Sequence, residues 1–306
     1  MVTNLNPASE VFLANMERIQ KQIADASQQV SSGKRVNVAS DAPDEIDAIL
    51  QLRSDMARNS QLKSNLSMAK TDADAADSAL SSATQLLDRA ITLGSQGANF
   101  TLDAAGQQTI AAEVQTLQDQ MVAISGTTVQ GRYIFSGDAD GSPAYASDAT
   151  VPGGVNRLLT APATRRVEDP SGGSFAVGQT AQNIFDSRNP DDSAASGNVF
   201  AALNGLRVAL LNNDPAGITT AVGALHAASD HLNISQTSYG AVENRITDAT
   251  TFSDQYDIQL QTELSQKQDA DVTSAVMLMT QGNTQLQAAF AMQAKMPHTT
   301  LFDFLG

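Results

Sequence analysis

Apolar residues recur every three or four positions near both ends of the chain. Near the start the repeat runs through Phe12, Met16, Ile19, Ile23, Ala26 and Val30, and near the end through Val272, Val276, Met279, Asn283, Leu286 and Phe290. This spacing places the residues on one face of a helix, and such a face needs a partner helix. Two such stripes at opposite termini suggest that the ends pair with each other or with the ends of neighbouring copies. The pattern favours a subunit of an assembly over an enzyme.

Helix signals continue through the first half of the chain. The first helix is expected to begin between Asn6 and Ser9 and to end at Gly33, because glycine is favoured just past a last turn. A polar link follows, in which Asp41 is a candidate N-cap of the next helix. That second helix is expected over about 44–94, with a seam of mostly small residues at the same step: Leu62, Leu66, Ala69, Ala73, Ala76, Leu80, Ala83, Leu87 and Ala90.

An irregular block separates these helices from those that follow. After a turn at 97–100, a third helix ends near 126–131 and carries one apolar face, made of Ile110, Val114, Leu117, Met121 and Ile124. The stretch 131–198 then holds paired glycines and short apolar runs, which are typical of short strands and turns, with disordered loops as an alternative around 189–192. Helices resume at Val199. A long helical segment starts at 214–215 and runs towards Lys295, with a break expected at Tyr239-Gly240 and a stop at Pro297.

These elements predict a mainly α fold with a small β-rich insert: an elongated bundle of long helices from both termini plus a central β-containing domain. We expect an N-terminal assembly helix and link at 1–42 and the first half of the long-helix bundle at 43–130. The central β-rich domain takes 131–198. The second half of the bundle follows at 199–271, and a C-terminal assembly helix at 272–306.

Composition supports this picture and narrows the function. Among 306 residues only 5% are aromatic and none is Trp, which favours alanine-rich helix packing over a large aromatic core. The formal net charge is -15, from 18 Lys and Arg against 33 Asp and Glu, so neither nucleic acid nor an anionic membrane is an expected partner. The absence of Cys excludes disulfides, thiolate metal sites and Cys nucleophiles.

Targeting signals are also lacking. The first seven residues include no basic segment followed by an apolar one, as a secretory signal requires, and no apolar run is long enough to span a membrane. We therefore expect a chain that stays in the cytoplasm or leaves the cell without a cleaved signal peptide.

Candidate chemistry is weak throughout. His226 and His231 are five residues apart, whereas helical metal pairs need three or four. A stretch that begins like a calcium loop at Asp138 has Ala149 at its twelfth position, where a Glu ligand is needed. Clustered carboxylates at 72–77 and 269–271 fit solvated helix faces. We expect no catalytic residues, no metal and no cofactor, and an enzyme within 131–198 is disfavoured because that block has no His.

Three motifs resemble one known family. The block 29–37, Gln-Val-Ser-Ser-Gly-Lys-Arg-Val-Asn, followed by Ala-Ser-Asp-Ala-Pro at 39–43, is similar to the N-terminal signature of bacterial flagellins and their junction relatives. The motif 131–137, Gly-Arg-Tyr-Ile-Phe-Ser-Gly, resembles one typical of hook–filament junction proteins, the hook-associated protein 3 group. The C-terminal helix from 269 and the tail Leu-Phe-Asp-Phe-Leu at 301–305 resemble the same family's end.

The resemblance implies a structural adaptor in the extracellular bacterial flagellum, exported unfolded and uncleaved. Its implied partners are copies of itself in a ring, hook-associated protein 1 on the hook side, flagellin on the filament side, and an export chaperone before secretion. The terminal segments 2–30 and 272–305 would carry the subunit contacts, and our candidates there are Phe12, Met16, Ile19, Ile23, Val30, Val272, Val276, Met279, Leu286, Phe290, Leu301, Phe302 and Leu305.

The sequence departs from the family pattern at a few positions. Ala42 stands where a second Asp is common, and Phe304 replaces a common Tyr, with Gly306 after it. The start, Thr-Asn-Leu at 3–5, is closer to flagellins. A flagellin that forms the filament shaft itself is therefore the alternative function.

Overall fold

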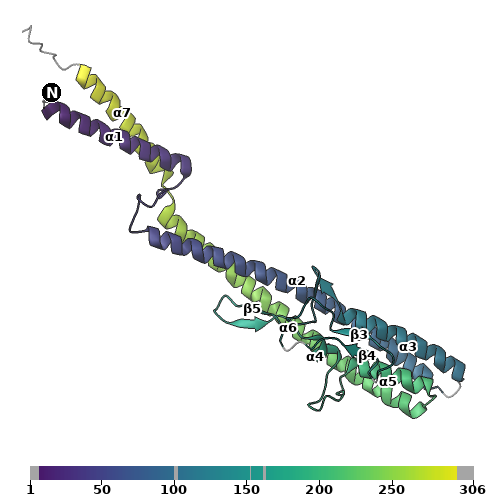
Figure 1. Cartoon of the computed structure of the whole chain (residues 1–306). Helices are drawn as coiled ribbons and strands as arrows, with labels where there is room; N and C mark the ends of the chain where they lie inside the picture. The colour runs from purple at the N-terminus through teal and green to yellow at the C-terminus, as the bar shows by residue number, and fades with distance from the viewer. Residues whose placement is uncertain (1–6, 100–102, 152, 161–162, 295–306) are drawn as a thin grey trace, which may run out of the picture. The chain divides into compact units, whose positions relative to one another are not determined.

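The structure is a computed structural model that describes residues 7–99, 103–151, 153–160 and 163–294 (Figure 1). Its elements in chain order are α1 (Pro7–Ser32), α2 (Ile46–Gly97), α3 (Ala104–Ser125), β1 (Thr128–Val129), β2 (Arg132–Tyr133), β3 (Tyr145–Ser147), β4 (Val155–Arg157), β5 (Arg166–Glu168), β6 (Ser174–Ala176), α4 (Ala181–Phe185), α5 (Val199–Leu211), α6 (Pro215–Gln268) and α7 (Val272–Ala294). The predicted mainly α fold with a small β-rich insert is confirmed.

The chain divides into two compact units. The terminal unit comprises Met1–Arg58 with Tyr256–Gly306, and the central unit comprises Asn59–Gln255. The terminal unit therefore holds α1, α7, the start of α2 and the end of α6. The central unit holds the rest of α2 and α6, together with α3, α4, α5 and all six strands.

The predicted seam of α2 forms the core of the central unit. Its members from Leu66 to Ala90 are buried, and the face of α3 that we expected to be apolar packs on the same core, with Val114, Leu117 and Met121 buried. The sequence predicts that α2 ends at about Gly94, but the helix continues to Gly97. A β-carbon at Gly94 would lie 2.6 Å from Val222 of α6, so glycine permits close helix packing there.

Helix α6 is continuous through Tyr239-Gly240, so the break expected there is wrong. Tyr239 is buried and its ring meets the Phe135 ring edge-on at 6.5 Å, which fixes the helix from the insert side. A glycine inside a helix costs only about 1 kcal/mol relative to alanine, and this packing offsets that cost. The helix ends at Gln268, and α7 begins after a short break at 269–271.

In the residues of the insert that the structure describes, the strands form three two-stranded antiparallel hairpins. The β1–β2 turn places Gln130 and Gly131 at φ values of 52° and 78°, as a two-residue hairpin turn with the right twist requires. The β5–β6 hairpin is fastened to α6 by Arg245, whose guanidinium lies 4.3 Å from the Phe175 ring centroid and 3.2 Å from Asp169 Oδ2.

The loop at 189–192, where we allowed for disorder, is a hydrogen-bonded turn. The Asn189 N–H donates to the Ser193 carbonyl at 2.9 Å, and Arg188 Nη1 donates to the Asp192 carbonyl at 2.7 Å. Across the described part of the chain, no helix is both long and apolar enough to cross a bilayer.

Candidate assembly surface

Helices α1 and α7 of the terminal unit pack side by side along most of their length (Figure 1). Met16, Ile19 and Ala26 of α1 are buried against α7, and Phe12, Ile23 and Val30 are half-buried on the same side. The two terminal helices therefore meet within one chain, as in the first of the two pairings that the sequence suggested, although only part of the predicted stripe of α7 takes part.

The face of α7 that packs on α1 is made mainly of small residues. It steps through Ala275, Met279, Gly282, Leu286 and Ala289, of which Ala275 and Gly282 are buried and the others half-buried. Met279 and Leu286 belong to the predicted stripe, but Val272, Val276 and Phe290 do not face α1. These three side chains are 44%, 41% and 56% exposed.

Large apolar side chains on the other sides of α7 thus remain open to solvent. We call them together the outer face of α7, and they are Val272, Val276, Met277, Leu278, Phe290 and Met292. Val11 and Leu13 of α1 are exposed as well. A helix that is apolar on nearly all sides is normally buried on all sides, and exposed apolar patches commonly mark interaction sites. The candidates Leu301, Phe302 and Leu305 lie outside the described residues.

The motif at 29–37 builds the connection between α1 and the end of α6. Gly33, at φ 69°, closes α1, and its N–H donates to the Gln29 carbonyl at 2.9 Å. Its own carbonyl accepts the Ala270 N–H at 3.0 Å. The Arg35 N–H donates to the Gln268 carbonyl at 2.7 Å. Backbone hydrogen bonds therefore join the link that follows α1 to the break between α6 and α7.

Side chains complete this connection. Arg35 Nη2 donates to the Lys267 carbonyl at 2.7 Å and to Glu45 Oε2 at 2.6 Å. Beneath it lies a small apolar cluster in which Val36, Ala42 and Ile49 are buried, with Leu264 packed against them. The link is thus a defined structure and holds α1 in register with α7.

Asp41 lies within this link, but it is not the N-cap of α2, which begins at Ile46. Its Oδ2 instead accepts the backbone N–H groups of Asn37 and Val38 at 2.8 and 2.9 Å. The bonds from Val38 and Asn37 lower the pKa of the Asp41 carboxyl below its usual value. The carboxylate is the acceptor that closes the turn at 37–41, and the N-cap prediction fails because the side chain points back along the chain.

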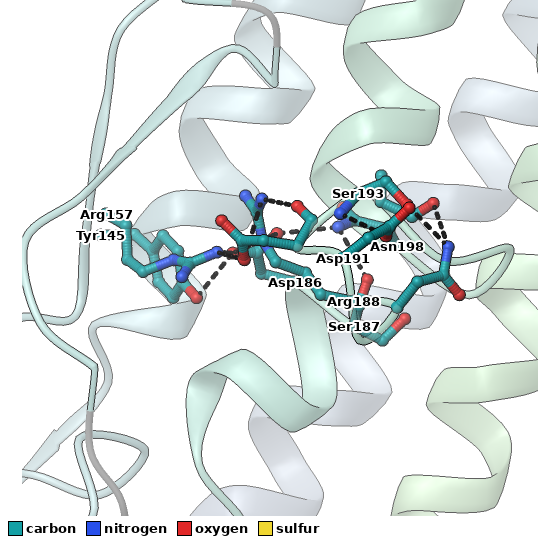
Figure 2. A network of polar contacts seen from close by, with 11 residues as sticks. Tyr145, Arg157, Asp186, Ser187, Arg188, Asp191, Ser193 and Asn198 are labelled. Carbon is teal, nitrogen blue, oxygen red and sulfur yellow. Dashed lines mark hydrogen bonds and ion pairs between the residues drawn. The ribbon is translucent and has the colours of Figure 1, made fainter.

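The central unit contains a buried polar hub around Asp186, which is 2% exposed (Figure 2). Its Oδ1 accepts from Asn198 Nδ2 at 2.7 Å and from Arg188 Nε at 3.1 Å. Its Oδ2 accepts from the Tyr145 hydroxyl at 2.9 Å and from Arg157 Nη2 at 3.2 Å. One carboxylate thereby connects β3, β4 and the loop before α5.

The hydrogen bonds of the hub give it a structural role. Burial, with the charge of Asp186, raises the pKa of the Tyr145 phenol well above its usual value, so the hydroxyl keeps its proton and donates a hydrogen bond to the carboxylate. Asn198 uses its side-chain oxygen to accept the Ala201 N–H at 2.9 Å and so caps the start of α5. Asp186 has both oxygens occupied by donors and therefore anchors the insert to α5.

The candidate metal ligands are not brought together. His231 Nε2 lies 2.7 Å from the Asn183 carbonyl, which uses that ring nitrogen in a local hydrogen bond. Within the described ranges, no group of three or more His, Asp and Glu side chains is arranged to hold a metal ion.

Sequence reasoning missed the two most buried residues of α7, Ala275 and Gly282. Both repeat the three-four step from Met279, but the large apolar side chains of Val272, Val276 and Phe290 form a more obvious stripe beside them. A seam of small residues, like the one recognised in α2, was the signal that identifies this face.

Comparisons with known proteins give a consistent picture. Residues 3–140 match the family model described as the bacterial flagellin N-terminal helical region, and residues 222–305 match the bacterial flagellin C-terminal helical region. Flagellar hook-associated protein 3 of Escherichia coli (strain K12) is 27% identical over 293 residues, which cover 90% of each chain. The protein of the same name from Salmonella typhimurium is 26% identical over 203 residues, which cover 64% of this chain and 62% of that relative.

A solved structure shares the fold. The crystal structure of flagellar hook associated protein-3 from Legionella pneumophila has a TM-score of 0.60 at 15% identity and covers 71% of this chain and 98% of its own. The two family models together span most of the sequence and include both α1 and α7, whose pairing forms the terminal unit. The chain belongs to the bacterial flagellin family.

Proposed function

We propose that this chain is a structural subunit of the bacterial flagellum that acts at the junction between hook and filament. The proposal is supported by relatives named flagellar hook-associated protein 3, one of which aligns over 90% of its length. The observation that carries the mechanism is the outer face of α7, where six large apolar side chains are exposed while the seam of Ala275 and Gly282 packs on α1.

Burial of this face is the driving force for assembly in the proposal. Fully burying one Val, Leu, Phe or Met side chain contributes about 1.5–3 kcal/mol, so a few such residues per neighbour offset the ordering of the contact. Paired α1 and α7 of the terminal unit would present the face to a neighbouring subunit. The candidate residues then have two different roles. Met16 and Ile19 stabilise the pairing of α1 with α7, and Val276 and Phe290 contact the neighbouring subunit.

The proposed place at the junction between hook and filament implies a set of partners. Copies of the chain associate in a ring, hook-associated protein 1 contacts them on the hook side, and flagellin contacts them on the filament side. Before export, a chaperone covers the apolar terminal segments, and the chain leaves the cell unfolded without a cleaved signal. The net charge of -15 keeps the unassembled chain soluble.

The outer face can be tested without disturbing the fold. Val276→Ser with Phe290→Ser should leave the circular dichroism spectrum unchanged and abolish incorporation at the hook tip, scored by immunogold labelling. Met68→Ser is the matched control, since Met68 is 43% exposed on α2 of the central unit, close to the 41% of Val276. Normal incorporation of the double variant contradicts the proposed surface.

Larger deletions test the terminal segments as a whole. Removal of 1–30 or 272–306 should leave the central unit folded and prevent incorporation. Retained assembly would refute the role of the terminal helices.

The phenotype of a null strain distinguishes the junction subunit from the alternative, a flagellin that builds the filament shaft. Filaments that form but detach from the hook indicate a junction subunit, whereas complete loss of filaments indicates flagellin. Growth of long fibres from the purified protein alone would also favour flagellin.

A further inference from the structure

A small cavity lies in the central unit where the insert meets two long helices. Its volume is about 20 Å³, and its lining includes Asp72 and Ala76 of α2, Ile134 and Gly137 of the 131–137 motif, Arg165, and Tyr239 of α6. A cavity holds a water molecule when this volume reaches about 10–15 Å³ and when polar groups face it. The space therefore suits one water molecule.

Asp72 supplies an acceptor without a partner. The side chain is 9% exposed, and its Oδ2 lies 2.9 Å from Arg165 Nη2 and 3.5 Å from Arg132 Nη2. Its Oδ1 is fully buried and has no hydrogen-bond partner among the described protein groups. A buried polar atom left in this state costs about 1–3 kcal/mol, so a donor is needed at this position.

Tyr239, which lines the same cavity, supplies a donor. Its hydroxyl oxygen accepts the Gln179 N–H at 3.0 Å, but its own proton has no acceptor among the residues that the structure describes. Burial raises the pKa of Tyr239 to about 12, so the proton is retained at neutral pH. Asp72 and Tyr239 both line the cavity, so one water molecule there can reach both side chains.

We propose that one buried water molecule occupies this cavity, accepts the Tyr239 hydroxyl proton and donates a hydrogen bond to Asp72 Oδ1. The ligand is neutral because the local charges already balance: Asp72 and Asp140 face Arg132 and Arg165. A cation would be repelled by Arg165 on the cavity wall, and an anion by Asp72.

The water gives the 131–137 motif a physical role. Arg132 reaches Asp72 of α2, Gly137 adopts φ 63° at the cavity wall, and Phe135 packs on Tyr239 of α6. The bound water would then connect α2 to α6 in a cavity that the motif also lines. The insert and the two helices would then share a polar contact at this point, in addition to the ion pair of Arg245 with Asp169.

A crystal structure of the full chain tests the site directly. We expect a single density peak within about 3 Å of both Asp72 Oδ1 and Tyr239 Oη. Absence of density in the cavity would overturn the proposal. So would an anomalous peak in crystals grown with rubidium chloride, because it would identify an ion.

A double-mutant cycle tests the bridge in solution. Tyr239 and Asp72 share no direct hydrogen bond, but the water should couple them. The effect of Tyr239→Phe combined with Asp72→Asn on the unfolding equilibrium constant should therefore differ at least about threefold from the product of the two single effects. Tyr145→Phe, whose hydroxyl donates to Asp186 instead, is the matched control and should combine additively with Asp72→Asn. Additive effects of Tyr239→Phe and Asp72→Asn would overturn the bridge.

Discussion

Gly282 of α7 lies directly against Ile23 of α1: a β-carbon at Gly282 would fall 2.6 Å from Ile23 Cγ1 and 3.1 Å from its Cδ1. Real β-carbons do not approach other atoms to 2.6 Å, and Cγ1 is held close to the α1 backbone. The absence of a side chain at this single position therefore sets how closely the two terminal helices approach.

Gly282→Ala should weaken the pairing of α1 and α7. Overpacking costs about 1–3 kcal/mol, which exceeds the roughly 1 kcal/mol that alanine gains over glycine in a helix. We expect amide hydrogens of α1 and α7 to exchange faster, while those of the central unit keep their protection.

Gly240→Ala in α6 is the control, because a β-carbon there meets nothing within 4 Å. It should be neutral or stabilising by up to about 1 kcal/mol. Ile23→Ala combined with Gly282→Ala should restore part of the protection by making room. Equal effects of the two glycine substitutions would contradict the role of Gly282 in close approach.

The same contact explains what the sequence could not resolve in α7. Large apolar residues at Val272, Val276 and Phe290 form a regular stripe, but the helix turns the neighbouring face with Ala275 and Gly282 towards α1. Both faces have the three-four step, so periodicity alone cannot choose between them. Packing against Ile23 decides, because only the face with small residues permits the close approach.

Elsewhere the success of prediction depended on how local the signal was. The α2 seam from Leu66 to Ala90 was predictable because the repeat is long and one face is buried throughout. The hub at Asp186 was not, because its donors Tyr145 and Asn198 are 41 and 12 residues away in sequence. The continuity of α6 at Gly240 likewise depends on the distant contact between Tyr239 and Phe135.

Asp186→Asn should destabilise the central unit severely. It removes the charge that pairs with Arg157 and Arg188, and breaking a buried ion pair costs about 3–5 kcal/mol because it leaves its partner uncompensated. Asp192→Asn is the control: Asp192 contacts the same two arginines at 3.3 and 3.5 Å but is 71% exposed. Exposed pairs contribute about 0–1 kcal/mol, so its urea midpoint should change little. Similar losses in both variants would contradict a buried hub.

Acidification should open the turn at 37–41 in the terminal unit. The N–H groups of Val38 and Asn37 bond the Asp41 carboxylate and lower its pKa, so the folded value lies below the unfolded value of about 3.9. These bonds stabilise the turn fully above the unfolded value and are lost as the pH falls through the folded value. The amide shifts of Asn37 and Val38 should titrate with a midpoint below the value of about 3.9 that a free Asp carboxyl has. Asp41→Asn should remove the titration, and a midpoint at or above the free value would contradict the assignment.

Asn59→Ala should weaken the contact between α2 and α6 in the central unit. Asn59 is buried at a seam position of α2, and its Nδ2 donates to the Ser253 carbonyl of α6 at 2.9 Å. Loss of such a hydrogen bond costs about 0.5–1.5 kcal/mol, and the truncated side chain adds a small cavity. The free energy of unfolding, measured with urea, should therefore fall by about 1–2 kcal/mol. Asn65→Ala is the control, since Asn65 bonds only its own helix through Gln61 and should change stability by less than about 0.5 kcal/mol. If the two substitutions have the same effect, the Asn59–Ser253 bond does not hold the helices in register.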